Sequence, residues 1–297
     1  MTDSPTPLEG SIVPLVTPFA SGAIDWAAFE ASVERQIAAG SDGIVVTGTS
    51  GEPTSVTADE RVELFRIAVA ATAGRIPVVA ATGAPNQLET LRLTRDAETL
   101  GVDAVLVVCP AFVKPSQPAL VQHFVTVAAS TELPMLIYNI PGRAAVGVTP
   151  QTVQAIVEAA PNVVGLKHAS NDLDLVTDLL LRLGDDFALF CGLESYSYPF
   201  LVVGGAGLMS AVGNLYPEQI AKLCALVRDQ QHAAALKLHR ELFRLNQAVF
   251  WDTNPVPLKA MLELRGIGNG EVRPPLLPAS ADLQSRLSVL LGQPAAA

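Results

Sequence analysis

The chain has 297 residues, of which 49% are hydrophobic and only 16% are charged, and its formal net charge is −10. This composition is too apolar for a disordered protein, and the sequence contains no run of eighteen apolar residues that would span a membrane. The acidic excess argues against nucleic-acid binding, because phosphate recognition needs clustered Lys and Arg side chains. We therefore expect a soluble globular protein that binds neither nucleic acid nor membranes.

The cysteines and the N-terminus bear on the compartment. Cys109, Cys191 and Cys224 are widely spaced and form no CxxC pair, so the sequence suggests neither a disulfide framework nor a zinc site. The opening residues, MTDSPTPLEG, lack the basic stretch and apolar core of a secretion signal. We expect a cytoplasmic protein with no bound metal.

Eight short runs rich in β-branched residues recur along the chain. They are nearly continuous in apolar residues rather than alternating, which indicates strands buried on both faces, as in a parallel sheet. The expected strands cover residues 12–16, 43–47, 77–81, 104–108, 135–138, 163–166, 187–190 and 206–209.

Amphipathic stretches of helical length separate these runs. Thr57 precedes Glu60 with the spacing of a capping box, and Pro118 and Pro150 stand where a first-turn proline is tolerated. Eight strand–helix units in a chain of this length predict an α/β protein with a single (β/α)₈ barrel. A doubly wound open sheet is the alternative, but no GxGxxG follows the first strand. The clearest expected helices cover residues 25–39, 57–71, 87–100, 118–130 and 150–159.

The chain changes character after the eighth expected strand. Helical stretches there are joined by a proline-rich link at 273–278. We therefore predict a barrel over residues 1–216 that carries the active site, and a C-terminal helical region over 217–297 packed on it. The helices expected in this region cover residues 217–228, 231–250, 257–265 and 281–291.

One lysine stands at the end of an apolar strand. In barrels of this kind the active site lies at the carboxyl ends of the strands, and the sixth expected strand runs through VVGLKHAS to Lys167. Partial desolvation there disfavours the ammonium form and favours the neutral amine, which attacks carbonyl groups. A lysine that reaches solvent or pairs with a carboxylate is an equally weighted alternative on position alone.

Other strands also end in polar residues. The fifth ends in LIYNIPGR, where Tyr138 can transfer a proton and Arg143 can hold a carboxylate. The second ends in VTGTSGEP, where Thr49 and Ser50 are flanked by glycines that let an anion approach the backbone. Taken singly, Tyr138 is more often a core residue and Arg143 a solvated charge, and the turn with Thr49 and Ser50 could equally be an ordinary strand-to-helix turn. The residues near the ends of the last two strands that could line the same substrate pocket are Gly192, Glu194 and Met209, although Glu194 could equally be a solvated loop acid.

The histidines do not form a catalytic pattern. Along a strand, His168 points opposite to Lys167, so we expect it to be structural rather than catalytic. His123, His232 and His239 lie on helical stretches away from strand ends. The sequence therefore predicts no metal site and no Ser-His-Asp arrangement.

Taken together, these segments resemble the dihydrodipicolinate synthase and N-acetylneuraminate lyase family. GTSGE at 48–52, YNIPGR at 138–143 and GLK at 165–167 occur in the order and spacing of that family, and the similarity extends from residue 10 to NPVPLK at 254–259. The resemblance implies a barrel enzyme that binds pyruvate, or another 2-oxo acid, as an imine on Lys167 and joins it to an aldehyde. It implies no metal or organic cofactor beyond this covalent imine.

The resemblance also implies roles for single residues. Tyr138 would relay protons, assisted by the hydroxyl of Thr49, and Ser50 would bind the pyruvate carboxylate in place of the more usual threonine. The backbone carbonyl of Met209 would line the pocket. Arg143 resembles the arginine with which synthases hold the carboxylate of aspartate semialdehyde, so the expected reaction joins pyruvate to aspartate semialdehyde. The expected assembly is a homotetramer built as a pair of dimers.

Two further departures from the synthase pattern bear on the chemistry. Phe112 replaces a tyrosine whose hydroxyl completes a proton relay, and His168 replaces a glutamate. These departures leave two alternatives open: an aldolase or dehydratase for another, sugar-acid-like 2-oxo acid, and a binding paralogue with weakened chemistry. Pro85 and Ala111 stand where lysine-inhibited synthases have an asparagine and a tyrosine, so we expect no inhibition by lysine.

Overall fold

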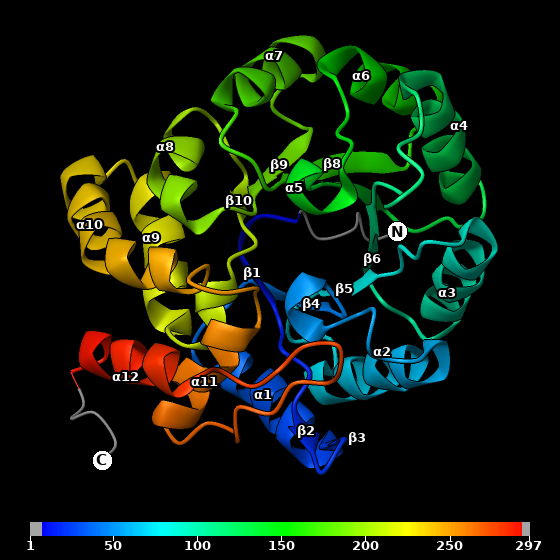
Figure 1. The fold of residues 1–297 in the computed structure, drawn as a ribbon. Helices are drawn as coiled ribbons and strands as arrows, with labels where there is room; N and C mark the ends of the chain where they lie inside the picture. Colours follow the sequence, from blue (N-terminus) through cyan, green and yellow to red (C-terminus); the bar gives the residue numbers. More distant parts are fainter. Residues whose placement is uncertain (1–7, 293–297) are drawn as a thin grey trace.

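The computed structural model describes residues 8–292, and its centre is a closed barrel of eight parallel strands (Figure 1). Each barrel strand pairs with the next barrel strand along the chain, and β10 closes the ring on β1. The predicted (β/α)₈ barrel is therefore confirmed. The barrel strands are β1 (Gly10–Pro14), β4 (Gly43–Val46), β5 (Val78–Ala81), β6 (Ala104–Val108), β7 (Met135–Asn139), β8 (Val163–His168), β9 (Ala188–Cys191) and β10 (Gly207–Leu208).

Helices surround the barrel as an outer ring (Figure 1). The helices of the ring are α1 (Trp26–Ala38), α2 (Ala58–Thr72), α3 (Gln87–Thr99), α4 (Gln117–Ala128), α6 (Pro150–Ala159), α7 (Leu173–Leu183), α8 (Ser197–Val202) and α9 (Pro217–Arg228). The shorter elements in the loops are the hairpin β2 (Phe19–Ala20) and β3 (Ala23–Ile24), the turn of helix α5 (Pro141–Ala144), and the 3₁₀ turns η1 (Thr49–Gly51), η2 (Glu194–Tyr196) and η3 (Ala211–Asn214).

The barrel strands are buried on both faces, as their continuous apolar runs indicate. Successive side chains of a strand point to opposite faces. On β7, Leu136 and Tyr138 belong to the cluster that fills the barrel, whereas Met135 and Ile137 belong to the larger core between the barrel and its helices. The alternation carries Tyr138 into the barrel at the level where the strands end.

The predicted helix signals act as expected. Thr57 accepts a hydrogen bond from the backbone of Glu60, whose carboxylate accepts one from the backbone of Thr57, so the capping box before α2 is complete. α6 begins at Pro150. α4 begins at Gln117, one residue earlier than expected, because Ser116 already has the extended backbone of an N-cap and leaves Pro118 within the first turn.

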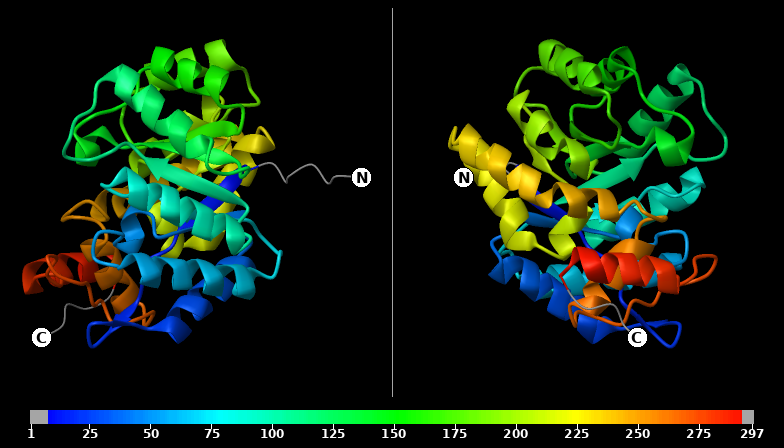
Figure 2. Two further views of the ribbon diagram at one scale, coloured as in Figure 1. Left: turned by 90° about the vertical axis from the view of Figure 1, so that its right-hand side faces the viewer. Right: turned by 60° about the vertical axis from the view of Figure 1, so that its left-hand side comes forward.

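The C-terminal helices α10 (His232–Ala248), α11 (Val256–Leu264) and α12 (Ala281–Leu290) lie together on one side of the barrel (Figure 2). α10 packs on α8 and α9, and α11 packs on η3 and α12. α9 also contacts β1, so it links the barrel to the C-terminal helices. The division at residues 216 and 217 stays a prediction, and residues 1–7 and 293–297 lie outside the described part. Between residues 8 and 292, no helix combines the length and the apolar character needed to cross a membrane.

Candidate active site

The pairing of β7 with β8 brings the two central residues of the predicted site together. In this parallel ladder Tyr138 lies opposite Lys167, and both side chains enter the barrel near the carboxyl ends of the strands. The Lys167 Nζ atom lies over the Tyr138 ring, 4.4 Å from its centroid. Lys167 retains only 3% of its accessible surface. Among the described residues no carboxylate forms an ion pair with it. The alternative of a lysine that reaches solvent is therefore excluded.

Gly192 supplies the space that Lys167 occupies. A Cβ atom at Gly192 would lie 2.7 Å from Lys167 Cε, a distance that real Cβ contacts essentially never show. It would also lie 3.2 Å from Lys167 Cγ, which is closer than most real Cβ contacts. The backbone N–H of Gly192 donates to the carbonyl of His168 at 2.8 Å, so strand pairing holds the glycine in this position. The absence of a side chain at Gly192 therefore leaves room for Lys167, and both residues line the same small cavity.

The η1 turn after β4 carries the predicted hydroxyl partner of Tyr138. The Thr49 Oγ1 and Tyr138 Oη atoms are 3.1 Å apart, within hydrogen-bond distance. Tyr138 is 95% buried, so this contact lies in a site largely shielded from water. Ser50 follows Thr49 in the same turn and is also buried. The structure thus brings Thr49, Ser50, Tyr138 and Lys167 together around one cavity.

Asn254 joins two of the predicted substrate-binding residues, and the sequence reasoning did not assign it to the site. Its side-chain N–H donates to Ser50 Oγ at 3.1 Å, and its backbone carbonyl accepts from Arg143 Nη2 at 3.0 Å. Arg143 itself is exposed on α5. Asn254 opens the segment NPVPLK, which marked it as part of a motif, but only folding brings it from the C-terminal region to η1.

Glu194 is buried and lines the inner cavity. Its Oε1 atom accepts a hydrogen bond from the backbone N–H of Ala211 at 2.6 Å, and its backbone carbonyl accepts one from Asn246. Burial raises the pKa of Glu194, although the Ala211 N–H and the charge of Lys167 oppose this shift. The solvated loop acid considered as an alternative is thus excluded. Met209 is buried and lines the same cavity.

Two cavities meet at this end of the barrel. The inner cavity, of about 40 Å³, is bounded by Lys167, Gly192, Glu194 and Met209, and the outer cavity, of about 300 Å³, widens toward the surface. The residues that line both cavities, and so form the boundary between them, are Thr49, Tyr138, Ile140, Arg143 and Asn254. The inner cavity around Lys167 therefore borders the outer cavity at the Thr49–Tyr138 pair and Arg143.

His168 and Phe112, which depart from the synthase pattern, have different surroundings. His168 is buried on the outer face of β8, where its Nδ1 atom lies 3.1 Å from Asn139 Nδ2, and it does not line either cavity. Burial lowers the pKa of His168, while Asp172 partly opposes this. Phe112 lines the outer cavity but is 89% exposed. The Thr49–Tyr138 contact is thus formed without any group from Phe112.

No other strong nucleophile competes with Lys167 in the barrel. Burial raises the pKa values of the thiols of Cys109, Cys191 and Cys224 to about 12, so all three stay protonated. Within residues 8–292, no group of three or more His, Cys, Asp or Glu side chains is placed to hold a metal ion. The chemistry that this geometry supports is attack by an enclosed amine on a carbonyl, with a tyrosine–threonine pair beside it for proton transfer.

Comparison with known proteins leads to one family. Residues 7–294 match the model of the dihydrodipicolinate synthetase family. A 4-hydroxy-tetrahydrodipicolinate synthase of Thermus thermophilus is 43% identical over 280 residues, which are 94% of each chain. The solved structure of the chloride-inhibited dihydrodipicolinate synthase from Acinetobacter baumannii, complexed with pyruvate, is 32% identical with a TM-score of 0.93 and covers 96% of this chain and 98% of that one. A monomeric dihydrodipicolinate synthase variant is 35% identical with a TM-score of 0.93, over 96% of both chains.

Proposed function

The chain belongs to the dihydrodipicolinate synthetase family, and we propose that it condenses pyruvate with aspartate semialdehyde to form 4-hydroxy-tetrahydrodipicolinate. The observation that carries this proposal is the Lys167 amine, buried beside Tyr138 in the inner cavity. The size of that cavity suits a small 2-oxo acid, and the outer cavity has room for the aldehyde. The similarity to a synthase crystallised with pyruvate supports the same choice of first substrate.

In the first half of the proposed reaction, the Lys167 amine attacks the keto carbon of pyruvate. The resulting carbinolamine loses its hydroxyl as water and leaves a protonated imine. Tyr138, which is within hydrogen-bond distance of Thr49, supplies the proton that the leaving hydroxyl needs. Ser50 and the N–H groups of η1 bind the carboxylate of pyruvate and thereby fix the keto carbon near Nζ.

In the second half, the oxygen of Tyr138, which gave up its proton in the first half, takes a proton from the pyruvate methyl group, and the imine nitrogen accepts the electron pair left behind. The enamine formed in this way attacks the aldehyde carbon, and Tyr138 returns the proton to the aldehyde oxygen. The amino group of aspartate semialdehyde then adds to the imine carbon and displaces the Lys167 amine. This step closes the ring and restores the free enzyme.

Arg143 is the proposed partner of the aldehyde's carboxylate. It lies on the boundary of the two cavities, and its guanidinium is already oriented by the carbonyl of Asn254. A planar guanidinium can bind a carboxylate through two hydrogen bonds. We expect Arg143→Gln to raise the KM for aspartate semialdehyde by about tenfold or more, because a hydrogen bond to a charged group contributes about 1.5–3 kcal/mol. The KM for pyruvate should stay within about twofold of the wild-type value. Steady-state kinetics with each substrate varied in turn measures this.

Trapping with borohydride tests the chemistry directly. Pyruvate and borohydride together should add one reduced pyruvate unit to the intact mass of the protein, and digestion should place it on Lys167. Lys167→Ala should not be labelled. Lys237→Ala removes an exposed lysine, with 81% of its side chain accessible, and should be labelled like the wild type. An unchanged mass for the wild type would refute Schiff-base chemistry and favour a binding role.

A coupled assay tests the second substrate. Wild-type protein given pyruvate and aspartate semialdehyde, with the reductase that consumes the product, should turn over far faster than Lys167→Ala. Equal rates would refute the proposed reaction. A panel of sugar-derived and hydroxylated 2-oxo acids covers the alternative aldolase and dehydratase reactions, and cleavage of one of them without synthase turnover would establish that alternative.

The cofactor and assembly predictions complete the proposal. The imine on Lys167 itself accepts the electron pair, so we propose that catalysis needs no metal or organic cofactor, and turnover should survive dialysis against EDTA unchanged. We propose a homotetramer built as a pair of dimers, although one similar solved protein is a monomeric variant. Light scattering coupled to size-exclusion chromatography distinguishes these states. Cytoplasmic location and insensitivity to lysine stay predictions.

A further inference from the structure

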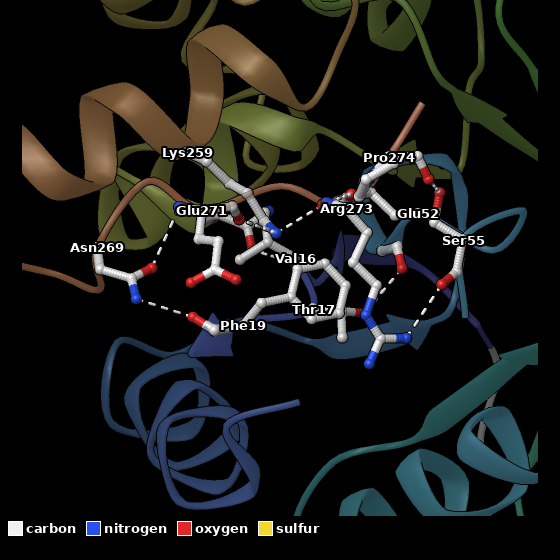
Figure 3. Close-up of polar contacts among 12 residues, drawn as sticks. Val16, Thr17, Phe19, Glu52, Ser55, Lys259, Asn269, Glu271, Arg273 and Pro274 are labelled. Atoms are coloured by element: carbon white, nitrogen blue, oxygen red, sulfur yellow. Dashed lines mark hydrogen bonds and ion pairs between the residues drawn. The ribbon is translucent and has the colours of Figure 1, made fainter. Parts of the chain in front are cut away.

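The last residue of the GTSGE segment, Glu52, takes no part in the proposed chemistry, yet it is buried directly after the active-site turn and lines the outer cavity. It follows η1 directly and has a left-handed backbone with φ of 55°. Its carboxylate Oε1 lies 2.5 Å from Lys259 Nζ, and Oε2 accepts the backbone N–H of Arg273 at 3.0 Å (Figure 3). The side chains of Glu52 and Lys259 are only 2% and 4% exposed. An ion pair is therefore enclosed next to the site.

Lys259 is itself held from several directions. Its Nζ atom donates to the backbone carbonyl of Glu271 at 2.8 Å and lies over the ring of Phe19, 4.2 Å from the centroid (Figure 3). The guanidinium of Arg273 lies 4.5 Å from the centroid of the same ring. We call Phe19, Glu52, Lys259, Glu271 and Arg273 the anchor cluster. It joins the β2–β3 hairpin, η1, α11 and the segment that follows α11.

Every residue that follows Thr49 in the turn is held by a different contact. Ser50 accepts from Asn254, and the carbonyl of Gly51 accepts the hydroxyl of Thr17 at 2.8 Å. Glu52 is held by Lys259. Asn254 and Lys259 both belong to the NPVPLK segment at the start of α11. One C-terminal segment thus holds η1 at two points, on either side of Gly51.

A buried ion pair is a poor source of stability, because the desolvation of two charges offsets most of their attraction. Burial lowers the pKa of Lys259 even with Glu52 beside it, which shows that the enclosed ammonium is held at a cost. What the pair does provide is a fixed distance and direction between η1 and α11. The displacement of a reacting group by about 1 Å can reduce a rate by about two orders of magnitude.

We propose that Glu52 and Lys259 are positioning residues that fix η1. They keep Ser50 in place to bind the pyruvate carboxylate and Thr49 in place to contact Tyr138. This inference rests on the proposed function, because it concerns the pyruvate half of that reaction. It assigns the C-terminal helical region a part in pyruvate binding. Arg143, the proposed partner of the aldehyde's carboxylate, lies on α5 outside the anchor cluster.

The test is a kinetic comparison of Glu52→Gln and Lys259→Met with the wild type. Each variant should raise the KM for pyruvate by about tenfold or more and slow borohydride trapping, which involves pyruvate alone. A merely structural role predicts a different outcome. Partial unfolding would lower the active fraction, and so kcat, without changing either KM.

Glu60→Gln is the matched control. Glu60 pairs with Arg273 beside the anchor cluster, with side chains 25% and 15% exposed, but it does not contact η1. Its loss should leave the KM for pyruvate at the wild-type value. If Glu60→Gln raises this KM as much as Glu52→Gln does, the effect comes from general loosening and the positioning inference is wrong.

The double variant Glu52→Gln with Lys259→Met covers the case in which the single variants fail to fold. It removes both buried charges, and such replacements are often neutral for stability. A raised KM for pyruvate in the double variant supports the inference, and a wild-type KM overturns it. A wild-type protein that neither traps nor consumes pyruvate refutes the proposed function, and the inference with it.

Discussion

The fit between Gly192 and Lys167 makes a quantitative prediction. Gly192→Ala adds one methyl group whose carbon would lie 2.7 Å from Lys167 Cε and 3.1 Å from Ala169 Cβ. Both neighbours belong to β8 and the turn after it, so neither can withdraw freely. The Lys167 side chain is the more flexible of the two, and we expect it to move.

The size of the effect follows from the distances. Ordinary van der Waals contact begins at 3.4 Å, so Cε must retreat by at least about 0.7 Å, and Nζ moves with it. Misplacement of a reacting group by about 1 Å costs about 10²-fold in rate, which corresponds to about 2.7 kcal/mol of activation free energy. Overpacking should also lower the free energy of unfolding by about 1–3 kcal/mol.

Single-turnover trapping with pyruvate and borohydride, followed by intact-mass measurement, reports the rate of imine formation without the second substrate. Gly142→Ala is the matched control, because this glycine lies beside Arg143 but a Cβ there would meet nothing within 4 Å. It should trap at the wild-type rate. If Gly192→Ala also traps within about twofold of the wild type while folded, then Lys167 does not need the space at Gly192 and our interpretation of the geometry is wrong.

Two further predictions concern the groups around Lys167. Tyr138→Phe keeps the ring under Nζ but removes the hydroxyl that meets Thr49, so kcat should fall by about 10²–10⁴-fold with little change in unfolding free energy, as measured by coupled kinetics and urea unfolding; an unchanged kcat would exclude proton transfer by Tyr138. Burial raises the pKa of Glu194, so the folded state favours the protonated carboxyl group more than the unfolded state does. The contribution of Glu194 to the unfolding free energy is therefore full below the ordinary carboxyl pKa and is lost as pH rises through the raised pKa. Glu194→Gln should therefore flatten the decline in unfolding free energy as pH rises above the ordinary carboxyl pKa, and a variant that declines as steeply as the wild type would contradict this.

The barrel and its central residues were predictable because both depend on local patterns. Continuous β-branched runs indicate parallel strands buried on both faces, and eight of them with helices between leave few other architectures. Parallel strands all end at one edge of a barrel. Residues at those ends whose side chains point into the barrel, such as Tyr138 and Lys167, therefore lie at the same edge.

Contacts between distant segments depended on the tertiary structure. Glu52 and Lys259 are 207 positions apart in the sequence. No local pattern shows that Lys259 of α11 contacts Glu52 at the end of η1. The same holds for Asn254, which meets Ser50 and Arg143 only because the C-terminal helices lie on that side of the barrel. Burial of this kind is a property of the whole fold, since it depends on which surfaces cover one another.

By itself, the sequence determined the barrel and placed Tyr138 and Lys167 at the carboxyl ends of neighbouring strands, because strand periodicity and strand ends are encoded locally. The tertiary structure alone decided how the site is shaped and held. It enclosed Lys167 against Gly192 and turned Glu194 from a possible loop acid into a buried carboxyl group. It also left Phe112 exposed at the rim, because the distance between side chains from different strands and loops is set only when all of them pack.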